Sequence, residues 1–281
     1  MKMRFTAAVG FLVSLSALLI VSPAKAVIPA GLDLGTDNNF AFIDLGASTL
    51  GWNSGPVAGN VLFGLGLHAN LSGGNNGGIS NGGLLFHDST ATISGSLQNP
   101  VTESLVPNTT TQGAATIAQN VSSFASSLAA TQSVGTTISG TTTITGNGGL
   151  NVIDVANITN AKLTISGNAN DFFVFNVSNA VMTNQPMTLS GVSADQILFN
   201  LTGTGTVFQT SGGDVSFGTY LATNGGKFQF SNLDLTGRLI SIGGDVQLVS
   251  GSKIPVPEPG VLGLFGIGAI ALACARKTSR K

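Results

Sequence analysis

A short motif recurs along the middle of the chain and restricts the folds open to it. Four tetrapeptides have the form Thr-(Ile/Leu)-Ser-Gly and a fifth is close to it; they begin at Thr92, Thr137, Thr164, Thr188 and Asp234. The spacings are 45, 27, 24 and 46 residues, the last being about twice 23. A strand that ends in glycine and recurs every ~20–27 residues is typical of β-solenoid coils. A β-sandwich with low-complexity turns is the alternative.

Short runs rich in β-branched and aromatic residues surround this motif, most of them bounded by Gly, Asn or Ser, as strands are. We expect strands at residues 163–166, 172–177, 187–189, 197–201, 206–209, 227–230 and 245–249. Glycine supplies 39 of the 281 residues, and it accepts the positive φ angles that coil corners require. The chain is therefore predicted to be mainly β.

One segment has a helical pattern. Between Gly113 and Ala130 apolar residues recur at i, i+3, i+4 and i+7, which gives a single apolar stripe. Thr109 and Thr111 bound a run of candidate N-cap hydroxyls, and Pro107 ends any earlier helix. The opposite face is polar and uncharged, so propensity alone would not stabilise this helix. We expect one long helix, at about 113–130, packed against the strands.

Charge is scarce. Only 8% of the residues are charged, against a usual ~25%. Residues 27–254 contain 11 acidic and 4 basic residues, a net charge of −7. Nucleic-acid binding is not expected, because it requires a Lys/Arg surface. The single cysteine, Cys274, lies outside this region, which therefore has no disulfide, thiolate zinc site or cysteine nucleophile.

The first 26 residues have the features of a secretory signal peptide. Lys2 and Arg4 form a positive start, an apolar stretch follows, and Ala24 and Ala26 form a small-x-small cleavage site. We expect export through the Sec machinery and a mature chain that begins at Val27. An uncleaved anchor helix is the alternative.

The C-terminal region, residues 255–281, has three parts. A Val-Pro-Glu-Pro-Gly motif at 256–260 comes first, an apolar run at 261–275 follows, and a basic tail at 276–281 comes last. Fifteen helical residues rise ~22 Å, short of a ~30 Å hydrocarbon core, so the predicted transmembrane helix is a marginal span. The basic tail fits a cytoplasmic stop. The motif residues are Val256, Pro257, Glu258, Pro259 and Gly260, and the basic stop residues are Arg276, Lys277, Arg280 and Lys281.

This order of parts resembles the PEP-CTERM protein-sorting domain. The resemblance implies recognition by an exosortase, a membrane cysteine transpeptidase, and processing near Pro257 and Pro259. It also implies a Gram-negative bacterium that makes an extracellular polysaccharide matrix. The protein would stay briefly in the inner membrane and then reach the cell surface or the matrix. A permanent single-pass anchor is the alternative.

The exported region, residues 27–254, resembles a second group. Early strands, a helix and then a strand-rich stretch containing 171–177, 197–200 and 233–240 make it similar to ice-binding-like and choice-of-anchor A surface domains. This resemblance covers roughly residues 39 to 250. It implies an irregular right-handed β-solenoid with the helix alongside.

Catalytic groups are few. His87 and Asp88 are neighbours, but adjacent strand residues point to opposite faces. Arg238 has no acidic cluster near it in the sequence. Two Gly-Gly-Asp triplets read as Asx turns. We therefore expect no enzyme activity, no metal site and no cofactor. Trp52 and Tyr220, each the only residue of its type, are the candidate ligand contacts, because aromatic rings stack on sugars.

The expected function is that of an exported surface or matrix protein. We expect structural or adhesive work in association with exopolysaccharide or a biofilm. Ice binding, or binding of another ligand, on the same fold is the alternative. Thr-x-Thr pairs that would suit a flat ice-binding face occur at 141–143, 202–204 and 204–206, but not once per coil. A polysaccharide-active enzyme that uses Asp171 or Arg238 is the third hypothesis.

Overall fold

Parallel strand pairs dominate the computed structural model, which describes residues 28–53, 55–72, 77–97, 101–212, 214–249 and 251–255. Every strand pair in these residues is parallel, and one α-helix, α1 (Asn108–Ser127), is present. A mainly β chain with one long helix is thus confirmed. The predicted signal peptide, PEP-CTERM motif, apolar run and basic tail lie outside the described residues, and the domain limits stay predictions.

Successive coils stack their strands on three sides. The side under α1 contains β1 (Phe40–Leu45), β4 (Asn60–Gly64), β7 (Leu85–His87), β9 (Glu103–Leu105), β14 (Ile197–Leu201), and parts of β11 (Leu150–Ser166), β12 (Phe172–Thr183), β16 (Val215–Ala222) and β18 (Asp234–Ile242). The second side, named the open face, contains β2 (Thr49–Trp52), β5 (His68–Leu71), β8 (Thr92–Gly95), β15 (Thr206–Thr210), β17 (Lys227–Ser231), β19 (Val246–Val249), and parts of β10 (Thr137–Thr145), β11 and β12. The third side includes β3 (Pro56–Ala58), β6 (Gly78–Ser80), β13 (Thr188–Ser190) and β20 (Ile254–Pro255).

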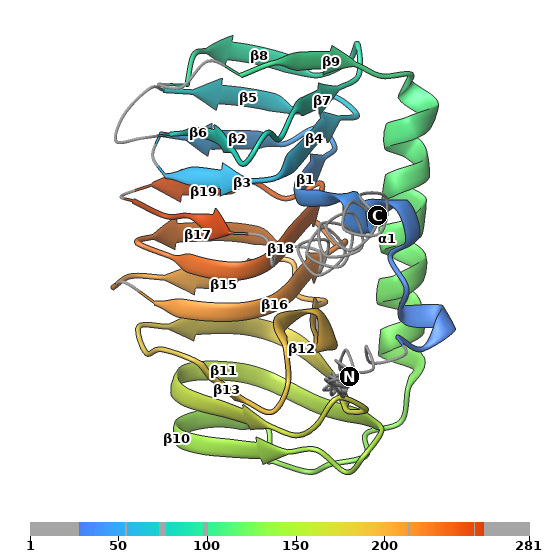
Figure 1. The fold of residues 1–281 in the computed structure, drawn as a ribbon, viewed down its shortest axis with the longest axis vertical. Coiled ribbons are helices and arrows are strands. Elements are labelled where there is room, and N and C mark those ends of the chain that lie inside the picture. The colour runs from blue at the N-terminus through green and yellow to red at the C-terminus, as the bar shows by residue number, and fades with distance from the viewer. Residues whose placement is uncertain are drawn as a thin grey trace, which may run out of the picture.

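The chain fills this stack in two stages, as Figure 1 shows. The first coils run from β1 to β8 and β9 at one end of the stack. The helix α1 then runs along the whole side to the other end, where β10 begins. Later coils return to the start, so that β18 pairs with β1, β19 with β2 and β20 with β3. A solenoid-like stack interrupted by a helix therefore encloses one continuous interior.

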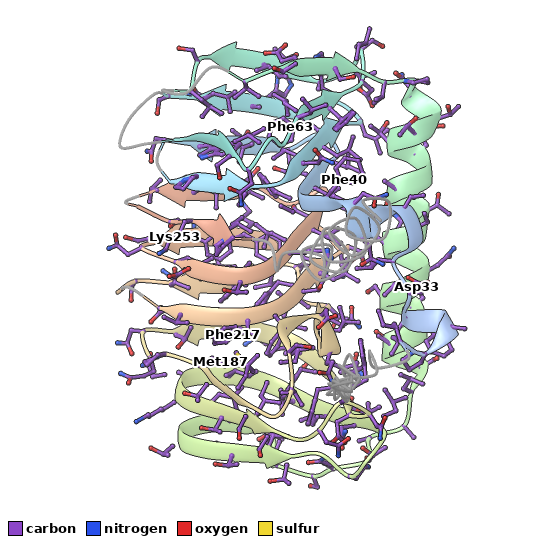
Figure 2. The ribbon with its side chains drawn as sticks, viewed as in Figure 1. Asp33, Phe40, Phe63, Met187, Phe217 and Lys253 are labelled. Atoms are coloured by element: carbon purple, nitrogen blue, oxygen red, sulfur yellow. The ribbon has the colours of Figure 1, made fainter. Side chains whose placement is uncertain are left out.

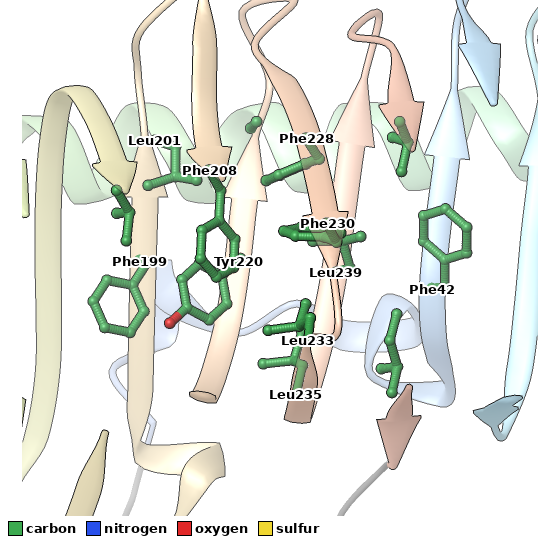
Figure 3. Close-up of a cluster of buried hydrophobic side chains, with 14 of the residues drawn as sticks. Phe42, Phe199, Leu201, Phe208, Tyr220, Phe228, Phe230, Leu233, Leu235 and Leu239 are labelled. Atoms are coloured by element: carbon green, nitrogen blue, oxygen red, sulfur yellow. The ribbon is translucent and has the colours of Figure 1, made fainter. Parts of the chain in front are cut away.

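Aromatic rings fill that interior. Phe175, Phe199, Tyr220 and Phe208 form a continuous stack with ring centroids 4.7, 4.5 and 4.1 Å apart. Figure 3 shows the last three between the strands, and Figure 2 shows Phe63 inside the stack. In-register parallel pairing places like side chains directly above one another, because Phe175 pairs with Phe199 and Phe199 with Tyr220. The repeat thus produces both the coil and its core.

The helix begins and ends earlier than the sequence predicts. It starts at Asn108 after Pro107 and ends at Ser127, and no side chain caps its first turn. The buried stripe of α1 includes Ala114, Ala118 and Ser122. It packs on apolar side chains of the strands on the side under α1. Small residues let the helix lie close to the strands. The expectation that the uncharged helix is held by packing is confirmed.

Short 3₁₀ turns complete the fold. The segments η1 (Ala30–Leu32) and η2 (Gly35–Asn39) contact α1, and η3 (Ala194–Gln196) precedes β14. Phe124 of α1 packs on Gly31, where a Cβ atom would lie 2.6 Å from the Phe124 ring. The helix is therefore held between the sheet and the segment that precedes β1.

Candidate functional site

The open face has no helix over it in the part of the chain that the structure describes. Figure 1 shows α1 on another side of the stack, where it contacts β4, β12, β14 and β16. Parallel pairing aligns the outward side chains of the open face in rows across the strands. A central row crosses nine strands, which at ~4.8 Å each span about 38 Å. Its members, in order, are Ser94, Asn70, Gly51, Gln247, Gln229, Gln209, Met182, Thr159 and Ser139.

This central row contains no ionisable side chain. Its middle consists of three adjacent glutamines, Gln209, Gln229 and Gln247. Residues next to these glutamines along the strands, such as Phe228 and Phe230 beside Gln229, point inward and belong to the hydrophobic core. The sheet therefore presents amides and hydroxyls, each both a donor and an acceptor, at the regular strand spacing, interrupted by Gly51 and by the exposed thioether of Met182.

The neighbouring row carries the charge of the open face. Lys227 Nζ lies 2.9 Å from Asp245 Oδ2, and Asp245 also accepts a 3.1 Å hydrogen bond from the Thr49 amide. The hydrogen bonds from Lys227 and Thr49 lower the pKa of Asp245. This ion pair thus places two opposite charges at one margin of the central row, which itself has no ionisable residue.

The Thr-x-Thr pairs do not share one surface. Gly140 bends β10, so that Thr143 lies on the third side, in register with Thr164, which pairs with Thr188. A second ladder beside it joins Thr145, Ser166 and Ser190. These ladders cross only three strands, whereas Thr206 lies on the open face. The sequence pattern therefore does not identify the long face.

Glutamine spacing is the signal that sequence reasoning missed. Gln209, Gln229 and Gln247 are 20 and 18 residues apart, and each lies among apolar residues of a strand. A polar residue that returns once per coil between core residues indicates a row on an outward face.

Trp52 and Tyr220 are fully buried, at 0% exposure. The Trp52 Nε1 group donates to the Gly55 carbonyl at 3.0 Å, and Tyr220 belongs to the aromatic stack. This burial counts against the expected role of Trp52 and Tyr220 as ligand contacts. Neither ring is available to a ligand on the surface, because both belong to the hydrophobic core, where large aromatic side chains bury much apolar area.

Asp88 serves the backbone. Its carboxylate accepts hydrogen bonds from the amides of Leu65 and Thr90 and from the hydroxyl of Thr111 at 2.5 Å. Despite the cost of burial, these bonds lower the pKa of Asp88 to about 2. The neighbouring His87 ring instead faces Glu103, at 3.6 Å. Asp88 therefore fixes a coil corner to the first turn of α1 and makes no acid-base pair with His87.

Asp171 has the same role at another corner. It accepts hydrogen bonds from the amides of Gly148, Gly149 and Asn168 and from the side chain of Asn151. These bonds lower its pKa although burial opposes this. The Arg238 side chain donates to the Asn38 carbonyl at 3.3 Å. Both residues proposed for catalysis thus have backbone partners.

Two further features concern metals and membranes. The described residues contain no group of three or more His, Cys, Asp or Glu side chains that could hold a metal ion. Among the same residues, no helix has the length and apolar character to cross a membrane.

Comparison with known families decides the nature of the C-terminal region. The model described as "PEP-CTERM protein-sorting motif" matches residues 255–277. The chain carries a PEP-CTERM sorting motif. The matched region starts at Pro255, which is in register with Ala58 on the third side of the stack. No curated protein matches the chain.

Solved structures similar to this chain share its fold. The ice-binding protein from the Antarctic ascomycete Antarctomyces psychrotrophicus is 17% identical, with a TM-score of 0.55, and the match covers 82% of this chain and all of that one. A glycosylated ice-binding protein from an Arctic yeast is 16% identical, with a TM-score of 0.56 and coverages of 83% and 97%. A protein from an Antarctic biological consortium, also described as ice binding, is 18% identical, with a TM-score of 0.52 and coverages of 84% and 96%. The predicted ice-binding-like fold is thereby confirmed.

Proposed function

We propose that this exported, PEP-CTERM-sorted protein binds ice through its open face. The central row of uncharged outward side chains across nine strands carries the proposal. The similarity of the fold to proteins described as ice binding supports it. This reverses the order expected from the sequence, in which adhesion came before ice binding.

Ice is an extended array of waters with fixed positions. A surface that binds it must be flat, rigid and weakly hydrated, so that many small contacts form together. Charged side chains oppose this because they hold their own hydration water strongly. The central row supports the proposal because it has no charged side chain and follows a hydrogen-bonded sheet, and Lys227 and Asp245 lie paired at its margin.

A second candidate ligand is a matrix polysaccharide. The adjacent amides of Gln209, Gln229 and Gln247 favour it, because an amide can donate to one sugar hydroxyl and accept from another. In this version the protein is a structural or adhesive component of the cell surface, the matrix or a biofilm. A polysaccharide-active enzyme remains the third hypothesis.

One pair of variants distinguishes these ligands. Gln229→Lys places a hydrated charge in the centre of the open face, whereas Thr164→Lys places the same charge on the third side. Ice binding predicts that wild type and Thr164→Lys shape ice crystals and partition into growing ice, and that Gln229→Lys loses at least tenfold in both assays. Normal ice binding by Gln229→Lys would refute the assignment of the face. Retention on exopolysaccharide without any effect on ice would support the second ligand.

We also propose the finer route of the protein. The leader is removed after Ala26, an exosortase processes the chain near Pro257 and Pro259, and the product remains at the surface or in the matrix of a Gram-negative bacterium. The match to the PEP-CTERM motif supports export and sorting at a membrane. Mass spectrometry of the native termini tests this: a chain still ending at Lys281 would contradict processing. The irregular, right-handed form of the solenoid stays a prediction.

A further inference from the structure

The open face ends in two copies of one tetrapeptide. At one end of the stack its last strand is β8, and at the other it is β10; Figure 1 shows them at opposite ends. Residues 92–95 and 137–140 are both Thr-Ile-Ser-Gly. Ser94 and Ser139 are the two end members of the central row defined above. The two edges therefore present the same side chains at the same places across the sheet.

The backbone matches as well. Both tetrapeptides end in a glycine with positive φ, +80° for Gly95 and +61° for Gly140. The Thr92 amide donates to Leu67, next to β5, so the peptide groups of Ile93 point to the free side. At the other end the Thr136 carbonyl accepts from β11, so the peptide groups of Thr137 point to the free side. Because the free peptide groups of Ile93 and Thr137 are one residue out of step, the two edges can form parallel hydrogen bonds with Thr92 opposite Thr137.

The two edge strands of the open face, β8 and β10, contain no charged residue and no proline, although Glu103 on β9 carries a charge at the same end of the stack as β8. Natural edge strands are commonly blocked by charges, prolines or a covering element. The sequence from Ser104 to Ile153, which includes β10, contains no ionisable residue, and β10 contains no proline. At the opposite end Leu105 is 68% exposed, although its register with His87 continues the core-facing positions of the coils below it. Among the described residues, no strand pairs with the outer edge of β8 or β10.

We propose that copies of this chain stack end to end, with β10 of one copy adding in parallel to β8 of the next. The register places Thr137 opposite Thr92, Ser139 opposite Ser94 and Gly140 opposite Gly95. Because all strands of the stack are parallel, a copy that is simply shifted along the stack continues the sheet without reversal. Such a head-to-tail contact does not close, and repetition builds a filament. The proposal does not depend on which ligand the open face binds.

The position of the sorting motif is compatible with this assembly. It begins at Pro255, in register with Ala58 on β3, and β3 lies between the two ends of the stack, nearer to β8 than to β10 (Figure 1). Pro255, the last described residue, therefore occupies neither edge of the open face. With each added copy, stacking would also lengthen the central row of the open face by nine strands.

Cross-linking tests the contact in the full chain, purified in detergent. Ser94→Cys and Ser139→Cys are combined with Cys274→Ser, and a short bis-maleimide is added. The proposal predicts a ladder of dimers, trimers and larger species, and dimers only when two single-cysteine chains are mixed. The matched control replaces Ser139→Cys by Gln247→Cys, an exposed position of the same row in mid-stack, and should give at least tenfold less ladder.

A charge swap provides the second arm. In the cross-linking background, Thr92→Asp with Thr137→Asp places like charges opposite each other and should reduce the ladder at least tenfold. Thr92→Lys with Thr137→Asp should restore it. Circular dichroism verifies that each variant is folded, and light scattering measures the size of the wild-type chain. A wild-type monomer at all concentrations, together with a ladder no stronger than that of the control, would overturn the proposal.

Discussion

The Ser122 hydroxyl of α1 donates a 2.7 Å hydrogen bond to the side-chain oxygen of Asn200, 78 residues away on β14. The Asn200 amide group donates back to the Ser122 carbonyl at 3.1 Å and to Asn176 at 2.9 Å. Asn176 in turn donates to the Ala125 carbonyl at 2.9 Å. The uncharged helix is thus attached to the sheet by a buried amide ladder as well as by apolar contacts.

Asn200→Ala should lower the free energy of unfolding by about 2–3 kcal/mol, because it leaves the buried Ser122 hydroxyl and a helix carbonyl without partners. The matched control is Asn179→Ala. Asn179 also donates to an asparagine in the next coil, Asn157, at 2.8 Å, but it is exposed, so its loss should cost less than about 0.5 kcal/mol. Urea unfolding of both variants measures the difference. Equal effects would mean that the buried ladder contributes no more than the exposed one.

Periodicity was enough to predict the helix but not its attachment. The apolar stripe is a local property, and Ala114 and Ala118 are buried as expected. Ser122 and Thr111 are buried as well, because each has a hydrogen-bond partner in the interior. These partners, Asn200 and Asp88, lie 78 and 23 residues away in the sequence. No local pattern reports partners at such distances. Thr111 therefore read as a candidate cap, whereas its hydroxyl binds a corner carboxylate.

The same limit applies to the sheet. Strands such as β14 and β17 lie within a residue of their predicted bounds, because alternation and flanking turns are local signals. That β18 lies on β1 depends on register across 197 residues, from Phe42 to Leu239. The rows of the open face arise from such long-range register. The single Trp and Tyr could not be placed from the sequence, since an aromatic ring suits a core and a sugar site equally.

Two glycines should respond to alanine in opposite directions. A Cβ atom at Gly237 would lie 1.9 Å from the Gly218 carbonyl oxygen of the next coil, so Gly237→Ala should cost about 3 kcal/mol or more. Gly113 lies in α1 with open space around its Cα, and Gly113→Ala should stabilise the protein by about 0.5–1 kcal/mol. Thermal unfolding measures both. A tolerated alanine at 237 would show that adjacent coils are not packed as closely as the structure has them.

The buried carboxyl group of Asp37 should make the stability of the protein depend on pH. Asp37 is buried in η2 without a hydrogen-bond partner for its carboxylate among the described residues, and burial raises its pKa to about 7. The folded state therefore favours the protonated acid. Its contribution is fully present below about pH 4 and is lost as the pH rises toward 7. We expect a loss of about 1–2 kcal/mol between pH 4 and 8.

Asp37→Asn should remove this part of the slope, because the amide does not ionise. Thr36→Ala, a non-titrating change at the adjacent exposed position, should keep the wild-type slope. Melting temperatures at pH 4, 6 and 8 compare the three proteins. If Asp37→Asn retained the full slope, the carboxyl of Asp37 would not be the titrating group.

Tyr220 should tolerate loss of its hydroxyl but not of its ring. The ring lies between Phe199 and Phe208, while the hydroxyl is fully buried and, although near Ser216, forms no hydrogen bond with a described residue. Burial of the phenol raises the pKa of Tyr220. Because an unpartnered buried hydroxyl is unfavourable, Tyr220→Phe should raise the free energy of unfolding by about 1 kcal/mol.

Tyr220→Leu is the matched change that removes the ring. It interrupts the aromatic stack and leaves a cavity, so it should cost about 2–4 kcal/mol. Urea unfolding again gives both values, and a change of sign between the two variants separates ring packing from the hydroxyl. A loss of more than about 1 kcal/mol in Tyr220→Phe would mean that the hydroxyl does have a partner. That partner would be the Ser216 hydroxyl or a water in the small cavity that Tyr220 lines together with Ser216 and Met187.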